Sequence, residues 1–234
     1  MSSVLVFAGP SLPAGTEPDP SIRLMPPARC GDLIRALRHD PVAIGLVDGV
    51  FEIAPTVWHK EILAVMDRGV AVYGAASLGA LRAAELDRYG MIGVGAIYEA
   101  YRDGMVDSDA AVMVSHAPGE LGYRPLTVAL VDVEATLRAA RLDPADLTLL
   151  RQIASRMNFR DRSWTAILAD FAARADVDRT NRVSAEIAAC AFSQKERDTM
   201  ALLEQITVGH GLAEPGQDVP RTVFLERLLN ICAM

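Results

Sequence analysis

A serine stands where a strand pattern turns into a helix pattern. Residues 70–73 form an apolar run, small residues follow, and an Ala-rich stretch begins at Ser77. A helix starting there points free backbone N–H groups and the positive end of its dipole at the space above the strand. This geometry suits acyl transfer through an oxyanion. Ser77 is therefore a candidate nucleophile, and the N–H groups of Leu78 and Gly79 are candidate oxyanion donors.

A second role is more common for serines at such corners. The serine of a hydrolase elbow usually follows a glycine by two residues, and this chain has Ala75 there. As a helix N-cap, Ser77 would instead accept a hydrogen bond from the N–H of Gly79 or Ala80. The sequence leaves both roles open.

Two histidines are candidate general bases. His59 lies three residues after Thr56, the predicted N-cap of a helix over residues 56–68, where the helix dipole favours a neutral imidazole. His116 follows another apolar run. His59 also falls on the apolar face of its helix, which is typical of a packed core histidine. The two candidates stay open.

Polar residues follow all four predicted strands, over residues 4–8, 42–47, 70–73 and 110–114. Parallel strands end at one edge of a sheet, where ligands bind. We therefore expect a site at this edge, with Ser11 and Asp48 contacting substrate and Glu52 orienting the base. Taken singly, Ser11 and Asp48 also fit ordinary turns.

Arg82 and Glu85 follow Ser77 on the same predicted helix. Their i,i+3 spacing is that of a surface ion pair. Because they share the helix of Ser77, we also consider them as substrate-binding residues, with Arg82 receiving an anionic group.

Helical patterns separate the apolar runs over residues 32–38, 56–68, 77–87 and 96–102. This alternation predicts an α/β fold, a parallel Rossmann-like sheet with flanking helices. After Pro125 only helices are predicted, over residues 126–141, 144–157, 163–175, 184–206 and 222–232. We place an α/β core domain at residues 1–142 and a helical C-terminal subdomain at 143–234.

Composition narrows the partners and the location. The 234 residues are 51% hydrophobic and carry a net charge of −7, without a run of Lys or Arg, so neither nucleic acid nor an anionic membrane is an expected partner. The start lacks a signal-peptide pattern, and no segment is long and apolar enough to span a membrane, so we expect a cytoplasmic protein. Glycine-rich phosphate loops and metal-ligand clusters are missing too, so we expect no cofactor and no metal.

The three cysteines are far apart in the sequence, which argues against disulfides and a zinc site. Cys30 lies near a helix start and a cation, so it offers a persulfide-carrier alternative that needs a reactive thiolate. Cys190 and Cys232 fall in apolar helical patterns and are expected to be buried.

Several separated motifs resemble the core domain of the TfuA-like family. They lie at residues 6–12, 45–52, 58–63, 74–86, 90–91, 101–104 and 116–126, and the resemblance covers roughly the first 140 residues.

The resemblance implies a partner of a YcaO-type enzyme, which converts a backbone amide of a precursor peptide to a thioamide with ATP. Such a protein would deliver sulfur by hydrolysing a thiocarboxylated, ThiS-like sulfur-carrier protein to release sulfide. The alternative is a non-catalytic adaptor that recruits the YcaO enzyme, its peptide or the carrier.

Overall fold

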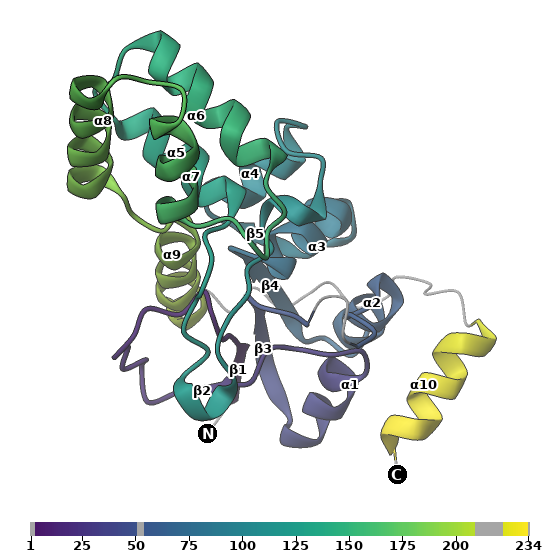
Figure 1. Ribbon diagram of the computed structural model, residues 1–234. Helices are drawn as coiled ribbons and strands as arrows, with labels where there is room; N and C mark the ends of the chain where they lie inside the picture. Colours follow the sequence, from purple (N-terminus) through teal and green to yellow (C-terminus); the bar gives the residue numbers. More distant parts are fainter. Residues whose placement is uncertain (1–2, 51–53, 209–221, 234) are drawn as a thin grey trace. The chain divides into compact units, whose positions relative to one another are not determined.

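A parallel sheet of five strands organises the first part of the chain in this computed structural model, which describes residues 3–50, 54–208 and 222–233. The strands lie in the order β2-β1-β3-β4-β5, and each neighbouring pair is parallel (Figure 1). This arrangement confirms the predicted α/β class. The strands are β1 (Ser3–Phe7), β2 (Ile22–Met25), β3 (Pro41–Leu46), β4 (Ala71–Ala75) and β5 (Ile92–Val94).

Helices bury both faces of this sheet, as expected for strands with continuous apolar sequences. One face packs against α1 (Asp32–Ala36), α2 (His59–Met66) and α3 (Leu78–Leu86). The other packs against Leu202, Leu203 and Ile206 of α9 (Gln194–Val208) (Figure 1). The same part of the chain also contains η1 (Leu37–His39), η2 (Asp87–Tyr89), α4 (Ala96–Arg102) and α10 (Val223–Ala233).

Three strand predictions are confirmed and one is wrong. Residues 110–114 form no strand; the short helix η3 (Asp109–Ala111) overlaps them, because a brief apolar run does not distinguish a strand from other buried chain. The sequence reading missed β2, an edge strand within a Pro-rich segment, and β5. Strand β5 has only three residues, and a Cβ on its central Gly93 would lie 2.2 Å from the Tyr98 ring.

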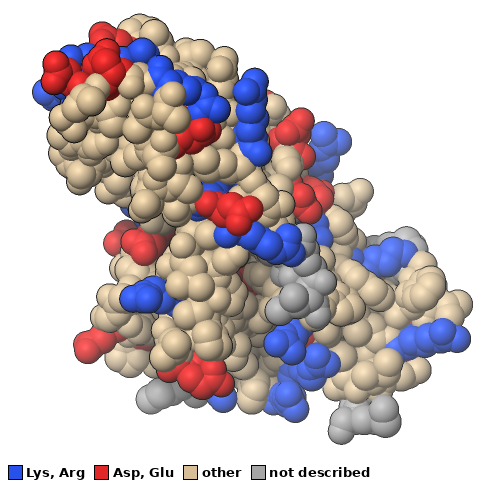
Figure 2. Space-filling model, viewed as in Figure 1, with Lys and Arg blue, Asp and Glu red and all other residues tan. Residues whose placement is uncertain are grey.

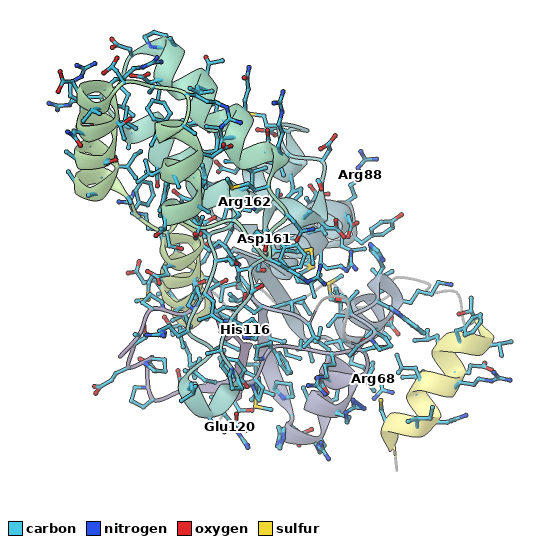
Figure 3. All side chains as sticks on the ribbon, in the orientation of Figure 1. Arg68, Arg88, His116, Glu120, Asp161 and Arg162 are labelled. Carbon is cyan, nitrogen blue, oxygen red and sulfur yellow. The ribbon has the colours of Figure 1, made fainter. Side chains whose placement is uncertain are left out.

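A second compact unit, residues 108–194, has its own apolar core. Besides η3, its helices are η4 (Gly119–Leu121), α5 (Leu130–Ala139), α6 (Pro144–Arg156), α7 (Trp164–Ala172) and α8 (Val177–Cys190). Helix α6 begins at the predicted Pro144, and Ser163 caps α7 by accepting from the Ala166 N–H at 3.1 Å. Buried Arg162, labelled in Figure 3, donates to the carbonyl oxygens of Ala154 and Met157 near the end of α6.

The compact units differ from the predicted division between residues 142 and 143. One unit combines residues 1–107 with 195–234, and the other holds residues 108–194. The reason is α9, which follows the second unit in sequence but buries its apolar residues against the sheet. The single helix predicted over residues 184–206 is wrong, because the chain leaves helical geometry at residues 191–193, between α8 and α9.

Charges on the second unit occur as mixed pairs. Glu134 accepts from the Nε atoms of Arg138 at 3.0 Å and Arg151 at 2.8 Å. Figure 2 shows acidic and basic side chains side by side in the upper part of the view. None of the described helices has both the length and the apolar character needed to cross a membrane.

Candidate functional site

The chain turns from β4 into α3 through a strained corner. Ala76 adopts a φ of 63°, and the Ser77 N–H donates to the Ala75 carbonyl at 2.8 Å. This conformation is unfavourable for alanine and costs about 1–3 kcal/mol. Ala76 and Ser77 are both buried, so the surrounding packing holds the corner in place.

Helix α3 begins in direct contact with the sheet. The Gly79 N–H donates to the Val47 carbonyl at 3.1 Å, and a Cβ on Gly79 would lie 1.7 Å from the Leu46 carbonyl oxygen. The Gly79 N–H is thus already used, and the prediction that it binds an oxyanion is wrong for this state. Within the described ranges the Leu78 N–H has no hydrogen-bond partner, while the Leu78 side chain is fully buried over Gly49.

Ser77 holds the N-cap position of α3 through its backbone and not through its hydroxyl. Its carbonyl accepts from the N–H groups of Ala80 at 3.1 Å and Leu81 at 3.4 Å. In the described part of the chain its side chain makes no capping hydrogen bond, so the predicted hydroxyl cap is wrong. Only 4% of Ser77 is exposed, which restricts its access to a substrate.

Ser11 and Asp48 join the ends of β1 and β3. The Asp48 carboxylate accepts from the Gly9 N–H at 2.8 Å, the Ser11 N–H at 2.9 Å and the Ser11 Oγ at 2.7 Å. The strand order changes direction between these strands, where ligands of such sheets usually bind. Both residues are buried, so here the carboxylate itself fills that position. Glu52, the predicted orienting carboxylate, lies outside the described residues.

The open, polar cluster of the sheet unit lies between α2 and α3. His59 Nε2 is 2.7 Å from Glu85 Oε2, and the Arg82 Nη1 lies 2.6 Å from the same oxygen. The Arg82 Nε donates to the Val57 carbonyl at 3.0 Å. Arg82 thereby ties Glu85 to the segment before α2. We call His59, Arg82 and Glu85 the His59 cluster.

The structure corrects two predictions about His59. Helix α2 begins at His59, so this residue is the first of the helix and not the third, and Thr56 is not the cap. The His59 side chain is 46% exposed, so it is not a packed core histidine.

Charge fixes the hydrogen-bonding roles in the His59 cluster. Burial raises the pKa of Glu85, but hydrogen bonds from His59 and Arg82 outweigh it and hold that pKa below the usual carboxyl range. An ionised carboxylate only accepts hydrogen bonds, so His59 Nε2 carries the hydrogen. In neutral His59, Nδ1 is then left with its lone pair, as a general base requires.

The structure does not bring Ser77 and His59 into hydrogen-bond contact among the described residues. Glu85 lies eight residues after Ser77, which corresponds to about 12 Å along a helix. His59 is therefore paired near the far end of α3 and not at the corner.

His116 belongs to the second unit and follows no strand. His116 is labelled in Figure 3. Its Nδ1 lies 2.8 Å from the Ala117 carbonyl oxygen, and its ring packs edge-on against the Tyr123 ring at 5.8 Å. The prediction that His116 follows a strand at the sheet edge is wrong.

Two buried carboxylates were not predicted from the sequence, because each accepts hydrogen bonds at the start of a helix that is distant along the chain. Glu61 of α2 accepts from the Leu33 N–H in α1 at 3.0 Å. Asp198 of α9 accepts from the N–H groups of Ala96 at 3.1 Å and Ile97 at 2.8 Å at the start of α4. The burial of Glu61 could have been predicted, because this residue directly precedes Ile62 within an apolar helix pattern. The sequence around Asp198 contains no feature that predicts its burial.

Cys30 lacks the reactive thiolate that a persulfide carrier needs. Burial, together with the nearby Glu61, raises the pKa of the Cys30 thiol to about 11. The thiol is therefore protonated at neutral pH, which disfavours the persulfide alternative. Among the described residues, no group of three or more His, Cys, Asp or Glu is placed to hold a metal.

Comparison with known protein families gives a match. The sequence profile of the TfuA-like protein family matches residues 48–163, a range that includes the β4–α3 corner, the His59 cluster and His116. The motif at residues 6–12 lies outside this range. A search of curated proteins finds no match. The fold and the matched segment agree with the resemblance seen in the sequence, and the chain belongs to the TfuA-like protein family.

Proposed function

We propose that this protein delivers sulfur for YcaO-dependent backbone thioamidation by hydrolysing the thiocarboxylate of a small carrier protein. The observation that carries the proposal is the 2.7 Å contact between His59 Nε2 and Glu85 Oε2. A histidine oriented by a carboxylate is the usual base for acyl transfer. Family membership supports the thioamidation context.

In this mechanism His59 Nδ1 takes a proton from a water molecule that attacks the thiocarboxylate carbon. Glu85 stabilises the imidazolium that forms. The carbon–sulfur bond then breaks, and His59 returns the proton to the leaving sulfur. Water and thiocarboxylate are converted to carboxylate and hydrogen sulfide, with no change of oxidation state.

Arg82 is a positioning residue in this proposal. Its side chain is only 11% exposed and contacts both Glu85 and the Val57 carbonyl. These contacts occupy the guanidinium and hold the Glu85 oxygen toward His59. Ser11 and Asp48 support the neighbouring strand ends without contacting substrate.

One observation favours the adaptor as a second candidate. The exposed ring of Trp58, which directly precedes His59, meets the exposed ring of Phe224 in α10 edge-on at 6.5 Å. They are 38% and 68% exposed, and exposed aromatic side chains that lie together are typical of protein-docking surfaces. An adaptor would use this surface to recruit the YcaO enzyme, its precursor peptide or the carrier.

The test is sulfide release from a thiocarboxylated carrier by the purified chain alone. We expect the wild type to release sulfide and to leave the carrier with a carboxylate, as intact mass spectrometry would show. His59→Ala should lose the activity, and Lys60→Ala, one residue away, should keep it. If none of the proteins releases sulfide but His59→Ala still stimulates thioamidation by the YcaO enzyme, the adaptor is correct.

A further inference from the structure

Two cysteines that are far apart in the sequence converge on Gly31. Cys30 directly precedes this glycine, and Cys232 Sγ of α10 lies 3.5 Å from the Gly31 carbonyl oxygen. An ideal Cβ on Gly31 would lie 2.9 Å from the same sulfur, so Gly31 leaves room for the thiol. Cys30 is bonded to Gly31, so its backbone lies one peptide bond from the atoms that Cys232 Sγ contacts. The separation expected from the sequence does not hold in space.

Helix α10 is held over α1 and α2 by a small set of contacts. Leu225 is buried, and Leu229 and Cys232 pack against the core on that face of the sheet. Phe224 meets Trp58 at the other end of the helix. Val223 and Ile231 remain exposed, so α10 buries only part of its apolar surface. A covalent bond at Cys232 would fasten its last turn.

One guanidinium contacts both cysteines. The Arg35 Nη1 donates to Cys232 Sγ at 3.4 Å, and its Nη2 donates to the Cys30 carbonyl at 3.3 Å. The guanidinium contacts the sulfur of Cys232 but only the backbone of Cys30, so we assign Cys232 as the first nucleophile of the pair. Cys30 is the resolving thiol, and the raised pKa of Cys30 makes the second step faster at higher pH.

We propose that Cys30 and Cys232 form a reversible disulfide that fastens α10 to α1. With glutathione disulfide as oxidant, the Cys232 thiolate attacks one glutathione sulfur and releases one glutathione. Cys30, on losing its proton, then attacks the Cys232 sulfur and releases the second glutathione. Two protein thiols are oxidised and one glutathione disulfide is reduced to two thiols.

The experiment treats the full chain with glutathione disulfide and counts its thiols, with intact mass and peptide mapping. The three thiols should fall to one, with two hydrogens lost and a peptide joining residues 30 and 232. Cys190→Ser is the matched control and should form the same bond. Cys30→Ser and Cys232→Ser should stop at glutathione adducts, and a thiol reductant should reverse the change.

Hydrogen exchange gives a second readout. We expect slower exchange in residues 223–233 of the oxidised wild type and no slowing in Cys232→Ser. The proposal is overturned if all three thiols persist, if the wild type forms only glutathione adducts, or if the bond uses Cys190. These outcomes do not depend on sulfide release, so they are separate from the test of the proposed function.

Discussion

The two ends of α3 differ in almost every physical respect. At its start, Ala76 and Ser77 are buried in a strained turn against the glycines and carbonyl groups of the sheet. Near its end, Glu85 is open to solvent and joins His59 and Arg82. In the first region the Ser77 carbonyl and the Gly79 N–H are bonded to backbone groups, whereas in the second His59 Nδ1 has no hydrogen-bond partner among the described residues. The local sequence predicts a reaction site at the start of α3, but the contacts in the structure favour the His59 cluster near its end.

This difference indicates that the buried start of α3 positions the helix, whereas the His59 cluster near its end would carry out the reaction. The β4–α3 corner and the Gly79–Val47 hydrogen bond fix the start of α3 on the sheet, and the direction of α3 sets where Glu85 meets His59 of α2. The Ser11–Asp48 contact joins the ends of β1 and β3. Changes at the His59 cluster should therefore affect the rate, and changes at the buried strand ends should affect folding.

After the loss of the base His59 itself, the largest expected effect is that of Glu85→Ala. Without the carboxylate, His59 loses its orientation and the partner that stabilises its charged form, so kcat for sulfide release should fall by about 10²-fold or more. Steady-state sulfide release measures it. Arg88→Ala, on the exposed turn after α3 (Figure 3), should leave kcat unchanged. A Glu85→Ala enzyme as fast as the wild type would remove the His59 cluster from the mechanism.

Asp48→Ala should reduce stability instead. The change leaves two N–H groups and the Ser11 hydroxyl without their acceptor, and we expect a loss of about 3 kcal/mol in the free energy of unfolding. Urea titration measures it, with the exposed Asp67→Ala as the control. A loss as small as that of the control would contradict the supporting role of Asp48.

A smaller effect is the pH dependence of the stability that Glu61 contributes to the folded protein. Burial raises the pKa of this carboxyl despite backbone N–H donors that lower it. The folded protein holds the proton more tightly than the unfolded chain, so the stability from this group is present at low pH and lost as the pH rises through the folded-state pKa. Glu61→Gln removes the titration and keeps an acceptor for the Leu33 N–H.

The stability of Glu61→Gln relative to the wild type should therefore increase as the pH rises above the ordinary carboxyl range. Urea titrations at several pH values measure this difference. The exposed Glu120→Gln should show no such trend. A Glu61→Gln advantage that shrinks with rising pH would show that the sign is wrong.

The sequence predicted those features that depend on neighbours along the chain. Strands β1, β3 and β4 are continuous apolar runs, and the β4–α3 corner is a run of small residues, so all four were found. Strand β5 was missed because its three residues form a strand by pairing with β4. Helix α9 was assigned to the wrong unit because its partner face is formed by distant strands.

The candidate site also combines residues that the local sequence indicates with contacts that only the fold determines. Ser77 was recognised from its local setting, and His59, Arg82 and Glu85 were each selected. The Arg82–Glu85 ion pair follows from the i,i+3 spacing and is confirmed. The association of His59 with this pair was not predicted, because 26 residues separate His59 from Glu85 and the packing of α2 beside α3 decides which side chains meet. The sequence analysis therefore placed His59 or His116 beside Ser77 and considered Glu85 as part of a surface ion pair or as a substrate-binding residue.

The most direct test compares sulfide release by the wild type, His59→Ala and Ser77→Ala, each acting alone on the same thiocarboxylated carrier. If water is the nucleophile and His59 the base, Ser77→Ala keeps a rate within about threefold of the wild type, and His59→Ala loses about 10²–10⁴-fold. The opposite result, in which Ser77→Ala releases no sulfide and His59→Ala remains active, would place the reaction at the β4–α3 corner and contradict the mechanism.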